Sequence, residues 1–239
     1  MQRDLKAAPP GDAPVPSNGN GAIARRTFEL VGKRWNWLIV AEVLGGTRRF
    51  TQLQQSLDIP TALLAHRLSM LVAHGVLERR PCGRADRCEY WPTDKGRDLH
   101  PVLLALASWG ERHGSGPAPP AVTHNGNGNG NGNGSATRRA LEFAGLPWNL
   151  LILAEVHGGV HRFKQLQREG KIPRKTLARR LSMLVSHGVL ERRCYDESRR
   201  DRHEYWATDK GRGLYPALDA LIRWGDRYMP PDQQTALNN

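Results

Sequence analysis

The sequence predicts a mostly α-helical fold with small β-hairpins, an α+β arrangement of two similar domains in tandem. The main observation is an internal repeat, in which residues 34–54 recur as 147–167 and residues 67–80 recur as 180–193. A second observation is that each copy begins with apolar residues at helical spacing and continues into short segments rich in β-forming residues. We therefore interpret the chain as one structural unit present twice, rather than as a single large domain.

The repeat also sets the domain boundaries. Equivalent residues are 113 positions apart up to Arg193 and 115 apart from Glu204 onward, so the second copy has two extra residues, which we place in a loop. The linker contains an alternating Asn-Gly tract, which cannot bury apolar surface and is typical of a flexible tether, with a root-mean-square span of roughly 25 Å. The expected order is tail, first domain, linker, second domain and tail, over residues 1–23, 24–114, 115–136, 137–229 and 230–239.

Three helices are expected in the first half of each unit. In the first copy, residues 35–44 have apolar side chains at helical spacing, and a Gly-Gly pair ends the helix. A short helix follows over residues 51–57. An Ile-Pro turn then leads to a third helix, which begins near Thr61 and closes at Gly75.

After the third helix the hydrophobic period changes. Two β-forming segments, residues 76–80 and 88–93, enclose a polar loop and predict a two-stranded hairpin. Thr93 and Thr208 are the expected N-caps of a final helix, which Pro101 should bend. The order of helix, helix, turn, helix, hairpin and helix is that of a winged helix-turn-helix domain, present twice.

Five blocks recur in the same order in both copies: a Trp in the first helix, GG..RF..L, RL..L...G.L.R, EY...T.KGR and a terminal WG. These blocks resemble the HxlR-type transcription regulators, relatives of the MarR group, over residues 24–113 and 137–229. The resemblance implies DNA-binding winged domains that pair through their terminal helices on palindromic operators. Proteins of this type usually have one unit per chain, so this sequence departs from the pattern, and we expect an intrachain pseudo-dimer.

Apolar faces of the terminal helices are the expected contact between the copies. The tryptophans recur in three pairs and are interpreted as core or interface anchors, with an aromatic-lined pocket for a small-molecule effector as the alternative. The contact residues expected in the two copies are Phe28, Leu30, Leu99, Leu103, Leu106 and Trp109 with Phe143, Leu214, Leu218, Leu221 and Trp224.

The composition favours a nucleic-acid partner. The chain has 35 Lys and Arg against 23 Asp and Glu, giving a net charge of +12, and such a balance indicates a polyanion, here double-stranded DNA. We expect no membrane contact and a cytoplasmic, nucleoid-associated location, because the sequence has neither a spanning apolar run nor a signal peptide. Three Cys without a CxxC pair predict no metal site, and the sequence has no catalytic motif, so neither enzymatic activity nor a cofactor is expected.

The third helix and the hairpin loop of each copy are the expected DNA contacts, since such helices read base edges and flanking cations hold phosphates. In the first copy they are Thr61, Ala62, Leu63, His66 and Arg67 with the loop residues Arg84 and Arg87. In the second copy they are Arg174, Lys175, Thr176, Arg179 and Arg180 with the loop residues Arg199, Arg200 and Arg202. The first helix offers methyl groups and one certain cation and the second offers four cations, so we expect the copies to read unlike half-sites.

The sequence therefore predicts a sequence-specific transcription regulator, a repressor, that binds double-stranded DNA. One alternative is a sequence-tolerant nucleoid or architectural protein that uses the same surfaces. Another is a regulator that senses a ligand through the aromatic pocket, or an oxidant through Cys82 or Cys88 in the hairpin. The sequence leaves open the operator, the effector and whether two chains associate further.

Overall fold

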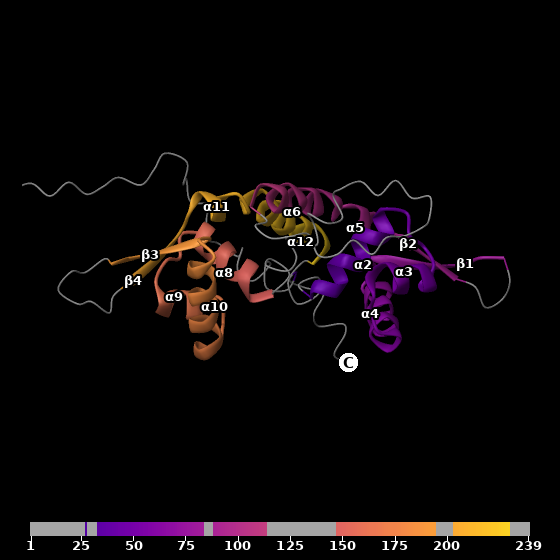
Figure 1. Cartoon of the computed structure of the whole chain (residues 1–239), viewed down its shortest axis with the longest axis horizontal. Helices are drawn as coiled ribbons and strands as arrows, with labels where there is room; N and C mark the ends of the chain where they lie inside the picture. The colour runs from indigo at the N-terminus through magenta and orange to yellow at the C-terminus, as the bar shows by residue number, and fades with distance from the viewer. Residues whose placement is uncertain (1–26, 28–32, 84–87, 114–146, 195–202, 230–239) are drawn as a thin grey trace, which may run out of the picture.

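A computed structural model of the chain describes residue 27 and residues 33–83, 88–113, 147–194 and 203–229. Two similar units lie at opposite ends of the molecule, and the last helix of each lies in the middle (Figure 1). Each unit contains one two-stranded antiparallel sheet. The mostly helical fold with small hairpins is thus confirmed.

Both units have the same order of elements. The first contains α2 (Arg34–Leu44), α3 (Phe50–Leu57), α4 (Thr61–Ala73), β1 (Leu77–Pro81), β2 (Cys88–Pro92), α5 (Asp94–Arg97) and α6 (His100–His113). The second contains α8 (Pro147–His157), α9 (Phe163–Glu169), α10 (Arg174–Ser186), β3 (Leu190–Cys194), β4 (His203–Ala207), α11 (Asp209–Arg212) and α12 (Tyr215–Tyr228). The winged helix-turn-helix order is present in both.

Helix α2 is the centre of the first unit and is buried on more sides than its apolar spacing predicts. Trp37, whose equivalent in the second copy is Leu150, is fully buried, as are Ile39 and Val43. The helix contacts α3, α4, α6 and β2. Because neighbours surround it, α2 needs apolar side chains around most of its circumference rather than along one stripe.

Helix α4 packs through the apolar face that the sequence predicts, since Leu64, Leu68 and Leu71 are buried. It ends at Ala73 with His74 as its C-cap, and Gly75 follows with φ of +67°. This left-handed conformation favours glycine and turns the chain directly into the hairpin. Gly188 has the same conformation after α10.

The final helix expected after Thr93 is in fact two helices. The Thr93 hydroxyl accepts a hydrogen bond from the Gly96 amide at 3.1 Å and caps α5, which is a single turn. The chain then turns at Asp98 and Leu99 before α6 begins. Pro101 explains the break, because its ring would clash with the carbonyl four residues earlier in a continuous helix. The prediction of one bent helix was therefore wrong.

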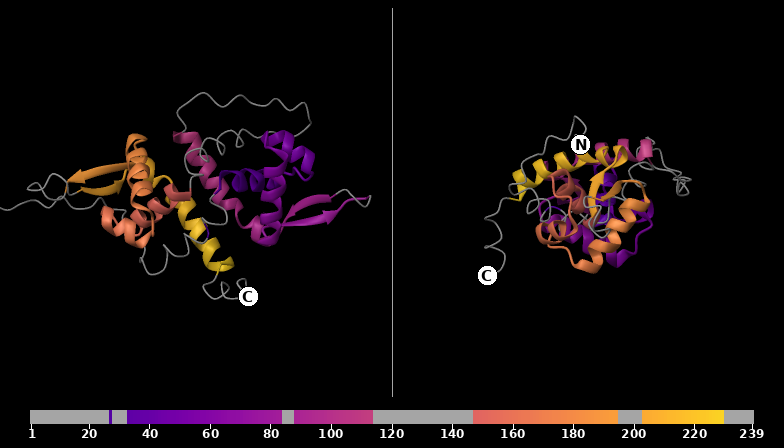
Figure 2. Two further views of the ribbon diagram at one scale, coloured as in Figure 1. Left: turned by 90° about the horizontal axis from the view of Figure 1, so that it is seen from below. Right: turned by 90° about the vertical axis from the view of Figure 1, so that its left-hand side faces the viewer.

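The two units dock through α6 and α12, which lie against each other (Figures 1 and 2). Trp109 Nε1 donates a hydrogen bond to the Lys210 carbonyl at 2.8 Å, and Trp224 Nε1 donates to the Lys95 carbonyl at 2.8 Å. Each buried tryptophan thus bonds the short helix of the other unit. The two units thus contact each other within the chain, and the tryptophan contacts repeat in both directions.

Most of the expected contact residues lie in this region. The leucines are buried, namely Leu99, Leu103, Leu106, Leu214, Leu218 and Leu221. Phe28, Leu30 and Phe143 lie outside the residues that the structure describes.

The second unit buries a carboxyl group that the first keeps hydrogen-bonded. Glu42 accepts a bond from the Thr47 hydroxyl at 3.0 Å, whereas its equivalent Glu155 has Val160 in place of the threonine. Glu155 is 7% exposed, and its Oε1 has no hydrogen-bond partner within the described ranges. Burial, with a smaller contribution from the charge of Glu169, raises the pKa of Glu155 to about 7.

This burial predicts a pH-dependent stability. Between the ordinary carboxyl pKa of 4.5 and about 7, the unfolded chain releases the Glu155 proton and the folded chain keeps it, so stability falls as pH rises. We expect Glu155→Gln to remove a loss of up to about 3 kcal/mol between pH 5 and pH 8. Urea unfolding at the two pH values measures the difference, with Glu42→Gln as the control. Equal pH dependence in wild type and Glu155→Gln would contradict this account.

Candidate nucleic-acid interface

Helices α4 and α10 lie on the same side of the molecule, away from α6 and α12 (Figure 1). The hairpins β1–β2 and β3–β4 point outward at opposite ends (Figures 1 and 2). The docking of the two units therefore presents two helix-turn-helix elements and two wings along a single face.

The turn before each of these helices is held by one buried side chain. Asp58 and Lys171 adopt left-handed backbone angles, with φ of +49° and +48°, and the next residues, Ile59 and Ile172, are buried. The helices α4 and α10 begin at Thr61 and Arg174, where the sequence predicts them, although the preceding prolines provide no side-chain cap. Anchoring by isoleucine fixes where each helix starts relative to the one before it.

The predicted DNA-reading residues of α4 divide into two groups. Thr61, Ala62 and His66 are exposed. Leu63 is only partly exposed and packs against the core, which corrects the expectation that it points away from the apolar face. Arg67 is half-buried, and its Nε is enclosed without a hydrogen-bond partner among the described residues.

Helix α10 presents more charge at the equivalent positions. Arg174, Lys175 and Arg179 are exposed, and Thr176 and Arg180 are half-buried. Burial, and secondarily the charge of Arg179, lower the pKa of Arg180. Three of the four predicted cations therefore project into solvent near the N-terminal half of the helix.

The difference extends over the whole helix-turn-helix. Residues 50–73 contain one Asp and one Arg and have a net charge of zero. Residues 163–186 contain seven Lys and Arg against one Glu and have a net charge of +6, which is half of the +12 of the chain. The two elements share a backbone plan and an apolar core but differ strongly in electrostatic potential.

Three cations of this segment were missed by an interpretation limited to the third helix. Lys164 and Arg168 on α9 and Lys171 in the turn are exposed. The equivalent residues in the first copy are Thr51, Gln55 and Asp58. Comparing the two copies over α9 and the turn that follows it, as well as over the third helix, would have found them.

Each wing is fastened to the helix-turn-helix beside it. Arg49 Nε lies 3.4 Å from the Glu89 carboxylate, and Arg162 Nε lies 3.0 Å from that of Glu204. The Cys82 thiol donates a hydrogen bond to Glu89 at 3.5 Å and is the largest cause that lowers the pKa of that carboxyl. The two arginine contacts thus join each hairpin to the residue directly before α3 or α9.

Arginines also stack on the wing tryptophans. The Arg48 guanidinium lies 4.4 Å from the centre of the Trp91 ring, while His161 stacks on Trp206 at 3.7 Å. The contact with a ring face favours a cation and adds to the packing of the strand. These ring contacts therefore join each hairpin to the segment before α3 or α9 of its own unit.

The loop arginines Arg84, Arg87, Arg199, Arg200 and Arg202 lie outside the described residues. The strands that carry the loops hold a further exposed arginine in each copy, Arg79 on β1 and Arg192 on β3. Within the described ranges neither forms an ion pair. Both were missed from the sequence, where the ERR motif was used only to predict a strand.

The described part of the chain gives little support for a metal site, a disulfide or a membrane-spanning helix. It contains no group of three His, Cys, Asp or Glu side chains that could hold a metal ion. The three cysteines, all in the described ranges, form no disulfide, and Cys194 is exposed while Cys82 and Cys88 are half-buried. None of the helices within these ranges is long and apolar enough to cross a membrane.

The family comparison matches each of the two units, and the similar proteins match stretches about as long as one unit. The model of the HxlR-like helix-turn-helix family matches residues 30–116 and 144–233. An HTH-type transcriptional regulator of Mycobacterium tuberculosis is 51% identical over 92 residues, which are 38% of this chain and 58% of that protein. One from Methanothermobacter thermautotrophicus is 38% identical over 90 residues, covering 37% of this chain and 68% of that protein. The chain thus spans little more than half the length of the mycobacterial relative.

A solved structure is also similar. The crystal structure of PA1607 is 37% identical in sequence, with a TM-score of 0.37 over 44% of this chain and 75% of that chain.

The ion pairs at the wings predict a measurable local effect. Arg162→Ala removes the pair with Glu204, and we expect amide hydrogen exchange in β4 to quicken about two- to fivefold, since the arginine is half exposed and the pair is worth at most about 1 kcal/mol. Hydrogen-exchange mass spectrometry measures this. Arg168→Ala is the control, because Arg168 pairs with the adjacent Glu169. Unchanged exchange in Arg162→Ala would show that the backbone alone holds the wing.

Proposed function

The chain belongs to the HxlR-like helix-turn-helix family, and from this premise we propose that it is a sequence-specific repressor that reads two unlike half-sites in double-stranded DNA. Its relatives are HTH-type transcriptional regulators. The observation that carries the proposal is the pair of helix-turn-helix elements on one face, one neutral and one with a charge of +6.

In the proposed complex α4 and α10 enter successive major grooves on one side of the duplex. This needs the two helices to be roughly 34 Å apart, the length of one DNA turn. The side chains near the start of each helix then face base edges. The docking of α6 on α12 supports this arrangement, because it holds both helices on the same side.

The second half-site would be the one with guanines. Arg174, Lys175 and Arg179 on α10 can donate to guanine O6 and N7. In the same unit the exposed Lys164 and Lys171 would neutralise phosphates beside the groove. This half of the molecule provides most of the counterion release on binding.

The first half-site would be read by smaller contacts. The methyl groups of Thr61 and Ala62 on α4 match the thymine methyl, and His66 can donate to a base acceptor. Because α4 has no exposed Lys or Arg, its contribution to the binding free energy comes from shape complementarity rather than from charge. Unlike half-sites follow from this difference.

The wings complete the proposed interface. The loop arginines Arg84, Arg87, Arg199, Arg200 and Arg202 would contact phosphates or a narrow minor groove, where the negative potential is enhanced. Arg79 and Arg192, on β1 and β3, would contact the sugar-phosphate backbone of the DNA. Bound in this way, the molecule would cover about two turns of DNA, and we infer repression by occlusion of a promoter.

Selection of binding sites from a random DNA pool by the full chain tests the function. At physiological salt, a specific regulator should prefer its selected site over unrelated DNA by at least about a thousandfold. The selected site should contain two different half-sites. A preference below about tenfold would favour an architectural protein, and no retention of DNA would show that the surfaces serve another partner.

The charge difference predicts an unequal effect of substitutions. The double variant Lys164→Ala and Lys171→Ala should weaken binding to all DNA sequences alike and lower the slope of log K against log salt by up to about 2, since each phosphate contact contributes about 0.9. The matched control is the double variant Thr61→Ala and His66→Ala in α4, which should change sequence preference but leave the slope unchanged. Equal loss of slope in both variants would contradict the proposed division of roles.

A further inference from the structure

The contact between the two units is symmetric at its tryptophans and asymmetric at its edge. Asp98, directly after α5, corresponds to Gly213, directly after α11. At the ends of the long helices, Tyr228 of α12 corresponds to His113 of α6. Each of these positions lies across from the other unit, so the two edges of the contact have different chemistry.

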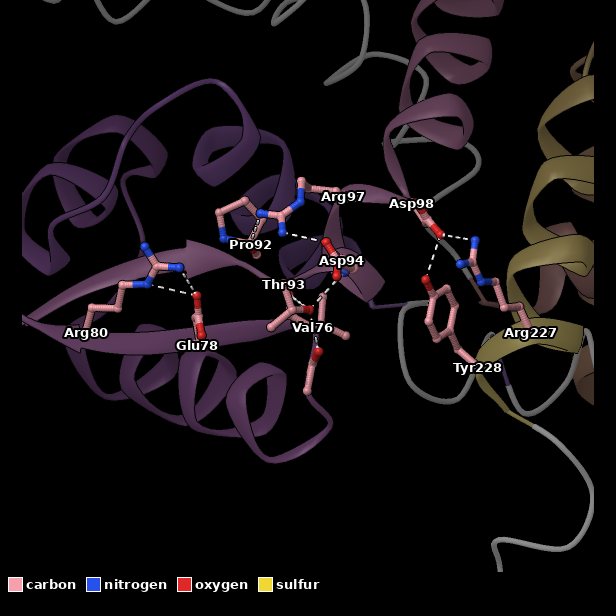
Figure 3. A network of polar contacts seen from close by, with 12 residues as sticks. Val76, Glu78, Arg80, Pro92, Thr93, Asp94, Arg97, Asp98, Arg227 and Tyr228 are labelled. Carbon is pink, nitrogen blue, oxygen red and sulfur yellow. Dashed lines mark hydrogen bonds and ion pairs between the residues drawn. The ribbon is translucent and has the colours of Figure 1, made fainter.

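At the first edge, Asp98 is the acceptor for two donors of the second unit (Figure 3). Its Oδ2 accepts a hydrogen bond from the Tyr228 hydroxyl at 2.6 Å and one from Arg227 Nη1 at 2.8 Å. The Tyr228 ring is half-buried and lies 5.6 Å from that of Trp224, which bonds the first unit. The ion pair with Arg227 is exposed and weak, so the bond from Tyr228 to a charged acceptor is the stronger contact.

At the second edge the equivalent site has no acceptor side chain. A Cβ atom on Gly213 would lie 3.1 Å from Trp109 Cδ1 and 3.4 Å from His113 Nε2. The imidazole of His113 therefore lies close to the glycine, where a larger residue would be crowded. The ring of His113 is 5.6 Å from that of Trp109, which repeats the placement of Tyr228 beside Trp224.

A pair of two first units, or a pair of two second units, would lose these contacts. Two second units would place Tyr228 and Arg227 against Gly213 at both edges, and the half-buried hydroxyl would have no carboxylate acceptor there. Two first units would place Asp98 against His113 at both edges, so that neither edge would contain the Tyr228 hydroxyl. Two unlike pairs contain two Asp98–Tyr228 contacts. Rearranging them into one pair of first units and one pair of second units therefore loses both contacts.

We propose that the α6–α12 interface selects the unlike unit, so that each first unit pairs with a second unit and not with another copy of itself. The partner is the second unit of the same chain, because the covalent link gives it a local concentration on the order of millimolar. The selectivity resides in protein contacts and does not require DNA. It ensures that a neutral and a basic reading helix are always present together.

Cutting the tether after folding tests the selectivity. A protease site is inserted within residues 125–134 of the full chain, the folded protein is cut, and the units are diluted and left to exchange. Native mass spectrometry then counts like and unlike pairs, since the two units differ in mass. We expect unlike pairs to exceed like pairs by at least about tenfold, which corresponds to about 1.4 kcal/mol. Equal numbers of like and unlike pairs, or units that stay single, would overturn the proposal.

Two variants assign the selectivity to Asp98 and Tyr228. Tyr228→Phe keeps the ring and removes only the hydroxyl, and Asp98→Gly makes the two edges alike. Both should bring the ratio of unlike to like pairs close to statistical, while Glu111→Gln, at an exposed position of α6, should leave it unchanged. Full selectivity in Tyr228→Phe would overturn the assignment even if Asp98→Gly failed to fold.

Discussion

The docking of α6 on α12 is the contact on which the rest of the molecule depends. The Asn-Gly composition of the linker does not by itself specify a distance between the two units. The reciprocal bonds of Trp109 and Trp224 to the opposite short helices do fix it. Because α5 and α11 follow the hairpins directly, the same bonds also connect the dimer contact to the wings and, through Thr93 and Thr208, to the ends of the reading helices.

The two units share a nearly symmetric backbone arrangement, but their surfaces differ. Helices α4 and α10 keep the same buried leucines, whereas the helix-turn-helix segments that contain them, residues 50–73 and 163–186, differ by a charge of 6. The interface differs as well, with Asp98 opposite Tyr228 on one edge and Gly213 opposite His113 on the other. Joining two units in one chain permits this divergence, since a single-unit homodimer must change both halves at once.

Much of this could be predicted from the sequence. The repeat, the helix starts at Thr61 and Arg174 and the hairpins follow from local pattern and were confirmed. The break before α6 was missed because the clash of Pro101 was expected to bend the helix rather than divide it. The bond between Asp98 and Tyr228 joins residues 130 positions apart, and the burial of Glu155 depends on packing around α8. Such contacts are set by tertiary structure and leave no local pattern.

The distance between the two reading helices tests the central claim most directly. Spin labels at Ala65 and Ala178, equivalent exposed positions on α4 and α10, can be introduced after replacing the three cysteines by serine. Pulsed electron resonance on the full chain without DNA should give one narrow distance distribution near one turn of DNA, about 34 Å. A broad distribution, of the kind expected for two units that move independently on their tether, would contradict the account.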